Sequence, residues 1–169
     1  MQRSLFRLEL KDRVGRKVLW IDECGIDHRL YRERGRAPRG EKIYQEVAGS
    51  RRGRTSIVAA YDGEKLVAPF LFDGSCMSDV FNFWLEKLLL PTLPKDTVLI
   101  FDNASFHKSS ETIELIEKAK CELLFLPTYS PDLNPIEHKW PQLKKIVRKT
   151  LPTSQNKVDS ICNAVLMLL

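Results

Sequence analysis

The sequence predicts an α/β fold, with a mixed five-stranded sheet and helices on both faces. Three apolar runs of strand length come first, and from Ser78 onward helical and strand patterns alternate. The order is therefore β-β-β-α-β-α-β-α, in which a meander precedes elements that suit parallel pairing. The chain has 169 residues, of which 43% are hydrophobic. This size and balance are typical of one globular domain, and we expect 1–169 to form a single domain.

The first three strands are predicted from short apolar runs with turn-forming residues between them. The first run covers 17–22, the second covers 55–61 and the third covers 66–72. An Asp-Gly dipeptide at 62–63 separates the second and third runs, which is a strong hairpin signal. Because proline cannot donate to a strand ladder, Pro69 predicts an edge position or a bulge for the third strand.

The middle of the chain alternates helices and strands. Ser78 is a favoured N-cap for a helix that Pro91 ends. A fourth strand is predicted over 97–102 and a fifth over 122–126. A helix from about 109 to 118 joins these two strands, as expected for a parallel pair.

Two further helices are predicted after a turn-rich segment. Asn134 is a favoured N-cap, Pro135 then occupies the first helical position, and the pattern continues to about Lys149. A last amphipathic helix covers 158–169. Pro141 falls within the first of these helices. Because proline removes a backbone hydrogen bond from a helix interior, we expect it to perturb that turn.

Composition excludes several classes of protein. No apolar run approaches the ~20 residues of a membrane span, and the first residues lack the apolar core of a secretory signal. The four cysteines are scattered and have no metal-site spacing, so we expect reduced thiols in a cytosolic protein. The glycine-rich motifs of nucleotide-binding loops do not occur.

Basic residues are concentrated in one stretch. The formal net charge is +5, from 27 Lys and Arg against 22 Asp and Glu. Residues 29–54 hold nine basic and three acidic side chains, so this stretch carries the whole excess. Such a cluster favours contacts with phosphates, although charged loops also occur as ordinary solvated surface. The basic residues are Arg29, Arg32, Arg34, Arg36, Arg39, Lys42, Arg51, Arg52 and Arg54.

Three acidic residues stand at positions suited to a cleft. Asp22 ends the first predicted strand, Asp102 ends the fourth, and Glu137 lies in the first turn of a helix. Converging carboxylates are hard oxygen ligands that suit Mg²⁺ or Mn²⁺. Two such ions about 4 Å apart can cleave a phosphodiester. Taken singly, each acid also suits a structural role, since Asp is common in turns and Glu137 stands at a capping-box position.

Three sequence blocks surround these acids: WIDECG at 20–25, FDNASFHK at 101–108 and LPTYSPDLNPIEHKW at 126–140. Together, in this order, they resemble the catalytic domain of mariner-superfamily transposases, especially of its bacterial insertion-sequence branch. The resemblance extends over most of the chain, and the fifteen-residue third block is its most specific part.

The resemblance implies a ribonuclease-H-like fold and a DDE-type transposase active site. Matched residue by residue, Asp22, Asp102 and Glu137 are the catalytic, metal-binding acids. The second and third are separated by 34 residues, a spacing common in this superfamily. The resemblance also implies two Mg²⁺ or Mn²⁺ ions per active site. The implied activity is cut-and-paste transposition, in which strand cleavage precedes strand transfer, typically into TA targets.

The implied partner is DNA, with two subunits paired on it as a homodimer. Relatives carry a DNA-contacting clamp loop where this chain has its basic insertion at about 27–54, so we expect those basic residues and Lys108 to bind DNA. Complete relatives carry helix-turn-helix modules before the catalytic domain. Because Asp22 comes so early, we expect these modules on a separate or frameshifted product. We expect the protein to act in the bacterial cytoplasm, at the nucleoid.

Polar residues beside the second and third acids are candidates for supporting roles. Glu23 follows Asp22 in an extended strand, so it should point to the opposite side and is not expected to be a ligand. The candidates that we expect to lie next to the acids without binding metal are Asn103, His107 and His138.

Two other functions are compatible with parts of the pattern. A ribonuclease-H-type nuclease without strand transfer would share the three acids, but would not be expected to carry the block that ends in Glu137. A non-catalytic DNA-binding module derived from a transposase would explain Pro141 and the missing N-terminal modules. Three clustered carboxylates argue against that module, because they repel DNA.

Overall fold

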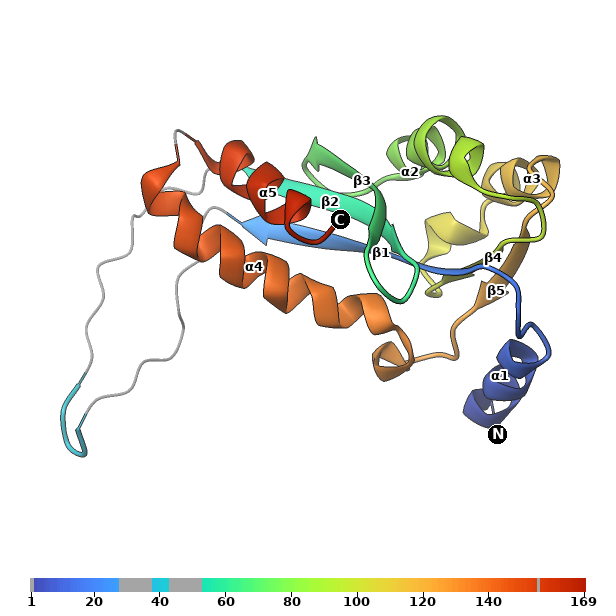
Figure 1. Ribbon diagram of the computed structural model, residues 1–169, viewed down its shortest axis with the longest axis horizontal. Coiled ribbons are helices and arrows are strands. Elements are labelled where there is room, and N and C mark those ends of the chain that lie inside the picture. Colours follow the sequence, from blue (N-terminus) through green and yellow to red (C-terminus); the bar gives the residue numbers. More distant parts are fainter. Residues whose placement is uncertain (1, 28–37, 43–52, 155) are drawn as a thin grey trace.

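The computed structural model describes residues 2–27, 38–42, 53–154 and 156–169. Its centre is a five-stranded sheet, and helices pack against both faces (Figure 1). The predicted α/β class and the number of strands are therefore confirmed. The strands are β1 (Val18–Asp27), β2 (Arg54–Tyr61), β3 (Leu66–Asp73), β4 (Val98–Phe101) and β5 (Glu122–Phe125).

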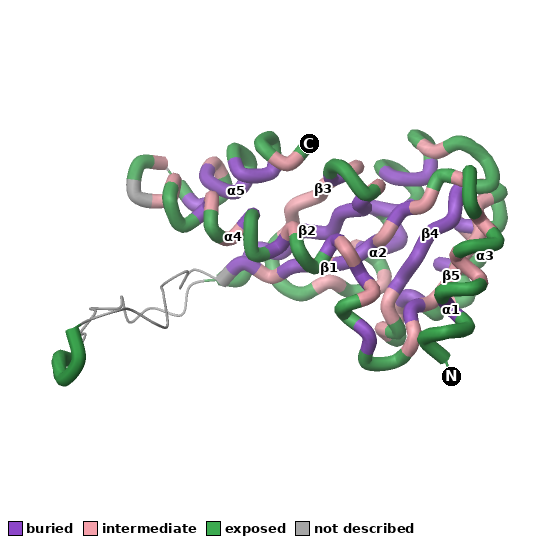
Figure 2. The backbone as a smooth tube through the Cα atoms, turned by 60° about the horizontal axis from the view of Figure 1, so that its bottom comes forward, coloured by how far each residue is buried: buried purple, intermediate pink, exposed green. Residues whose placement is uncertain are grey.

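The sheet is mixed, with the strand order β3-β2-β1-β4-β5. β1, β2 and β3 form an antiparallel meander, whereas β1, β4 and β5 are parallel. β4 is fully buried, as Figure 2 shows, but pairs with only the first three residues of β1, from Val18 to Trp20. β1 therefore continues past the end of β4, and its later residues pair with β2 alone among the described strands.

One face of the sheet is covered by α2 (Ser78–Trp84) and α3 (Ser110–Lys118). α2 continues into a π-helical turn, η1 (Leu85–Leu89), and a 3₁₀ turn, η2 (Leu90–Thr92). Alternate residues of β1 and β4 point toward these helices, which is why their apolar side chains meet there. The core on this face includes Leu19, Ile21, Phe81, Trp84, Leu99 and Phe101, all buried.

The other face is covered by α4 (Lys139–Thr150), α5 (Lys157–Leu166) and, beneath β4, α1 (Gln2–Lys11). α1 is held by one buried side chain, Phe6, which packs in a small cluster with Val98 and Leu126 and their neighbours. The main core on this face includes Ile26, Ile57, Trp140, Leu143, Val147 and Ile161.

Short 3₁₀ turns connect these elements. The turns are η3 (Ser105–Lys108), η4 (Pro131–Leu133), η5 (Pro135–His138) and η6 (Leu151–Thr153).

None of the helices in the described ranges has the length and apolar character needed to cross a bilayer.

The proline and cap predictions have different outcomes. β3 is an edge strand, and its pairing with β2 shifts register next to Pro69, so both alternatives predicted from this proline are confirmed. Ser78 is the first residue of α2, and the N-cap position belongs to Met77. The prediction that Ser78 caps this helix is therefore wrong.

The expected long helix after Asn134 is divided into η5 and α4. Asn134 makes no side-chain capping bond to η5, and α4 begins at Lys139. Pro141 is consequently the third residue of α4, where a backbone N–H has no partner within the helix. The expected place of Pro141 in a helix interior is therefore wrong, and the turn that carries Glu137 is a separate 3₁₀ segment.

Candidate active site

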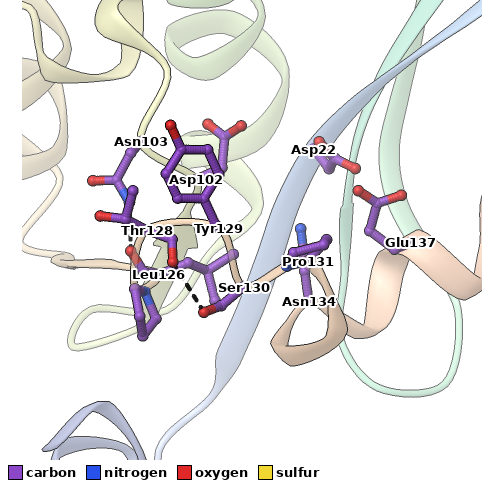
Figure 3. A pocket seen from close by; sticks show the side chains of 11 residues that line it. Asp22, Asp102, Asn103, Leu126, Thr128, Tyr129, Ser130, Pro131, Asn134 and Glu137 are labelled. Carbon is purple, nitrogen blue, oxygen red and sulfur yellow. Dashed lines mark hydrogen bonds between the residues drawn. The ribbon is translucent and has the colours of Figure 1, made fainter. Parts of the chain in front are cut away.

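A cavity of about 330 Å³ lies beside β1 at the point where β4 ends (Figure 3). Asp22 of β1, Asp102 just after β4 and Glu137 of η5 all line it. In Figure 3 the carboxylates of Asp22 and Glu137 point toward each other, and Asp102 stands apart from this pair. The structure thus brings the three predicted acids to one cavity from three separate elements.

The three carboxylates do not converge on a single point. Within the described part of the chain, no three His, Cys, Asp or Glu side chains are placed to hold one ion. The donor set nevertheless suits divalent cations, because carboxylate oxygens are the ligands that Mg²⁺ and Mn²⁺ prefer. The charge of Glu137 also raises the pKa of Asp22, a repulsion that a bound cation would relieve.

Asp22 is the buried member of the set, with 9% of its surface exposed. Its Oδ2 accepts a hydrogen bond of 2.7 Å from the indole Nε1 of Trp140. Burial raises the pKa of Asp22 to about 7, and the charges of Glu137 and Glu23 add to this rise. The bond from Trp140 opposes it by favouring the carboxylate form. Asp22 therefore titrates near neutral pH when no cation is bound.

Asp102 is held through one of its two oxygens. Oδ1 accepts a bond of 2.9 Å from the backbone N–H of Ala104 and lies 2.7 Å from Nδ1 of His107. The hydrogen bond with His107 lowers the pKa of Asp102 below its usual value, although burial opposes this. Asp102 is accordingly a carboxylate at neutral pH.

His107 is fully buried and lies between two carboxylates. Its Nε2 is 2.9 Å from Oε1 of Glu23, opposite the bond to Asp102. Burial by itself would lower the pKa of His107, but the hydrogen bonds and charges of Asp102 and Glu23 raise it to about 9. At neutral pH the ring is an imidazolium that donates from both nitrogens.

The expected supporting residues have different positions. His107 contacts Asp102, as described above. Asn103 lines the cavity, and its Nδ2 donates to the carbonyl of Leu126 at 2.5 Å. Lys108, predicted to bind DNA, donates to Oδ1 of Asn103 at 2.7 Å, so it is engaged next to the site. His138 is exposed and does not line the cavity.

Glu137 is exposed at the cavity wall, where the 3₁₀ geometry of η5 presents it. Its backbone N–H donates to the carbonyl of Asn134 at 3.1 Å, which closes the turn. The side chain of Asn134 also lines the cavity, and its buried Oδ1 has no hydrogen-bond partner among the described residues. The alternative reading of Glu137 as a capping-box residue is not supported, since Asn134 does not cap the turn with its side chain.

Three features of the site were not predicted from the sequence. Glu23 contacts His107, Trp140 contacts Asp22, and Tyr129 stands at the cavity wall with 96% of its surface exposed. Trp140 follows Glu137 by three positions, and residues at this spacing share one helical face. This spacing could have predicted that Trp140 faces the same site as Glu137.

A second hollow of about 420 Å³ adjoins the cavity, with Glu137 in the wall of both. Two cationic side chains line it, Arg54 from the start of β2 and Lys144 from α4. The guanidinium of Arg54 occupies the space that a Cβ on Gly25 would fill, so glycine is required there for Arg54 to reach this place. Glu23 and Glu137 line the same hollow, so its wall combines two cations with two carboxylates.

The predicted clamp loop lies largely outside the described residues. Arg39 and Lys42 are described and exposed, and Arg54 lines the second hollow. The predicted DNA-binding residues outside the described ranges are Arg29, Arg32, Arg34, Arg36, Arg51 and Arg52.

The DDE superfamily endonuclease family matches residues 17–159 of this sequence. The chain belongs to this family. The match contains all three acids of the cavity and every strand of the sheet. The predicted membership of a DDE-type family is therefore confirmed at this level.

Curated relatives of the chain include transposases of nematodes. It is 38% identical over 89 residues to the transposable element Tc3 transposase of Caenorhabditis elegans, a match that covers 51% of this chain and 27% of that protein. It is 33% identical over 82 residues to the Tcb2 transposase of Caenorhabditis briggsae, covering 46% and 30%. The matched segments thus span about a quarter to a third of these relatives.

Solved structures with a similar fold include complexes of the Mos1 transposase. A pre-cleavage Mos1 transpososome has a TM-score of 0.66 and 16% identity, covering 98% of this chain and 56% of that one. A Mos1 mariner paired-end complex with Mn has a TM-score of 0.65 and 16% identity, covering 99% and 58%. These similarities confirm the expected ribonuclease-H-like fold. The chain spans little more than half of the Mos1 chains.

Proposed function

We propose that the chain is the catalytic part of a DNA transposase that performs metal-dependent strand cleavage and strand transfer in cut-and-paste transposition. The observation that carries this proposal is the shared cavity, which Asp22, Asp102 and Glu137 line from three separate elements. The similarity to Tc3 transposase supports the same activity.

We assign these three acids as the residues that would hold two Mg²⁺ or Mn²⁺ ions. Such a pair activates a water or hydroxyl nucleophile and stabilises the leaving oxygen of a phosphodiester. Because the carboxylates do not meet at one point, an arrangement in which they are divided between two ions fits them better than a single three-ligand site. Mos1 complexes with Mn and with Mg support the choice of ion.

The DNA backbone has a matching path beside the acids. The hollow lined by Arg54 and Lys144 adjoins Glu137, so a strand that enters the cavity would pass two cations able to contact its phosphates. We propose that Arg39, Lys42 and the basic residues between 29 and 52 extend this contact. Each phosphate neutralised releases counterions and adds to a salt-dependent affinity.

Several finer features belong to the same proposal. We propose that the protein is of the bacterial insertion-sequence branch, acts at the nucleoid, and inserts into TA targets. We also propose that two subunits pair on the DNA as a homodimer.

The deciding experiment is a nicking assay with the full 169-residue chain. Supercoiled plasmid is incubated with the chain in Mg²⁺ or Mn²⁺, beside the Asp102→Asn variant. Asp132→Asn is the matched control, because Asp132 is an exposed acid that pairs with Arg3 and does not line the cavity. We expect nicking by the wild type and by Asp132→Asn, and its loss in Asp102→Asn.

A second arm separates the alternatives. Duplexes that carry a free 3′ hydroxyl are added as pre-cleaved ends, and their joining to the plasmid is measured. Joining supports a transposase, whereas nicking without joining supports a ribonuclease-H-type nuclease. Plasmid binding with neither reaction in the wild type would contradict both enzymes and support a non-catalytic DNA-binding module.

A further inference from the structure

His107 connects the ends of the two strands that supply the aspartates. Its ring bridges Glu23, which follows Asp22 in β1, and Asp102, which follows β4 (2.9 Å and 2.7 Å). The ring has no exposed surface and packs against Phe81 and Phe106, whose centroids lie 4.5 Å and 4.3 Å from its own. The ring is therefore tightly packed as well as hydrogen-bonded at both nitrogens.

This bridge stands where the backbone ladder has ended. β1 and β4 pair through Trp20 and Ile100, and both aspartates come two residues later. Beyond that pair, the hydrogen bonds of the sheet no longer hold the two strand ends at a set separation. The bridge from Glu23 to Asp102 through His107 is the side-chain link that takes over this task at the level of the acids.

The bridge also decides which carboxylate oxygen is available. Oδ1 of Asp102 is occupied by His107 and Ala104, which leaves Oδ2 for other ligands. Asp22 is held in a similar way, since Trp140 donates to its Oδ2. Ring N–H groups that bind one oxygen of a metal-ligating carboxylate fix the direction of the other.

We propose that Glu23, acting through His107, is a positioning residue that holds Asp102 in orientation and at a set separation from Asp22 for divalent cation binding. This inference rests on the proposed metal site, and it gives a role to an acid that points away from the cavity. Glu23 itself is not a cation ligand in this scheme. Its effect passes through the imidazole.

The test uses Glu23→Ala and the conservative Glu23→Gln in the full chain. Glu23 is partly exposed, so its replacement spares the core, unlike replacement of His107. Gln retains an oxygen that accepts from Nε2, whereas Ala leaves that N–H unpaired. Glu117→Ala on the exposed surface of α3 is the control for loss of one acid.

The first readout needs no metal. The backbone amide of Ala104 donates to Asp102, so its NMR shift and hydrogen exchange report how firmly that carboxylate is held. We expect faster exchange and a displaced resonance in Glu23→Ala, and near-wild-type behaviour in Glu23→Gln and Glu117→Ala. An Ala104 amide that is unchanged in Glu23→Ala would overturn the proposal.

The second readout is Mn²⁺ binding, followed by calorimetry and by broadening of the Trp140 indole resonance. Loss of such an indirect support costs about tenfold or more in metal affinity. We expect that loss in Glu23→Ala and recovery in Glu23→Gln, while unchanged affinity in Glu23→Ala would contradict the inference. If the wild type binds Mn²⁺ no better than Asp102→Asn, the proposed metal site fails, and the Ala104 readout still decides the positioning role.

Discussion

The indole Nε1 of Trp140 donates a hydrogen bond of 2.7 Å to Oδ2 of Asp22, across 118 positions of sequence. Trp140 is the second residue of α4 and follows Glu137 by three positions, and Asp22 lies in the middle of β1. This bond links the first turn of α4, which follows the turn of Glu137, to the strand that carries the first acid.

Removal of this donor should raise the pKa of Asp22 further. In Trp140→Phe the opposing effect of the bond is gone, while burial and the charges of Glu137 and Glu23 remain. We expect the pH midpoint of Mn²⁺ binding and of nicking to move upward from about 7. Trp84→Phe is the matched control, since Trp84 donates to the carbonyl of Ala68 in the other core. An equal shift in both variants would contradict the assignment.

The stability of the metal-free chain should depend on the protonation of Asp22. Its pKa is raised from 3.8 to about 7 on folding, so between these values the folded chain holds a proton that the unfolded chain has released. The free energy of unfolding therefore falls as pH rises from about 4 to about 7. Urea titrations at several pH values measure this slope, which Asp22→Asn should flatten. A slope that persists in the variant would exclude Asp22 as its source.

The salt dependence of DNA binding should reveal the phosphate contacts of the second hollow. A cation that neutralises one phosphate contributes about 0.9 to the slope of log affinity against log salt. We expect Lys144→Gln and Arg54→Gln each to reduce the slope by about that amount, because both side chains line the hollow beside Glu137. Lys118→Gln, on the exposed surface of α3, should leave it unchanged. Equal slopes in all variants would place the DNA elsewhere.

Pro141→Ala should have little effect on stability. Pro141 lies in the first turn of α4, where its N–H would have no partner in the helix. We expect the free energy of unfolding to change by less than about 1 kcal/mol. Leu143→Ala, two residues later and fully buried, should cost about 2–5 kcal/mol. A loss for Pro141→Ala as large as that for Leu143→Ala would mean that the proline supports the turn of Glu137.

The strands follow from local pattern, because short apolar runs bounded by turn residues predict them. The catalytic role of the three acids depends on the family resemblance and stays a prediction. The run over 17–22 lies in β1, which continues past the expected end to Asp27, and the run over 97–102 contains β4, which ends one residue before Asp102. The block that holds Glu137 supplies the third wall of the cavity. α1 was not predicted, because its sequence mixes both charge signs and only one of its residues, Phe6, is buried.

The role of Glu23 could not be predicted from strand alternation. Alternation correctly directs it away from Asp22, but says nothing of what lies on the other face. There the loop after β4 folds back and buries His107 within reach of both Glu23 and Asp102. A contact between residues 84 positions apart depends on tertiary packing, which local pattern does not encode.

The short length of β4 leaves space for the cavity, so residues inserted at the end of this strand should close it. β4 has four residues and accompanies β1 only as far as Trp20, and the cavity lies beyond that point. Two more residues in register would extend the ladder along β1 to the level of Asp22 and fill the space that the acids surround. We therefore infer that the early end of β4 leaves the gap beside β1 in which the cavity lies.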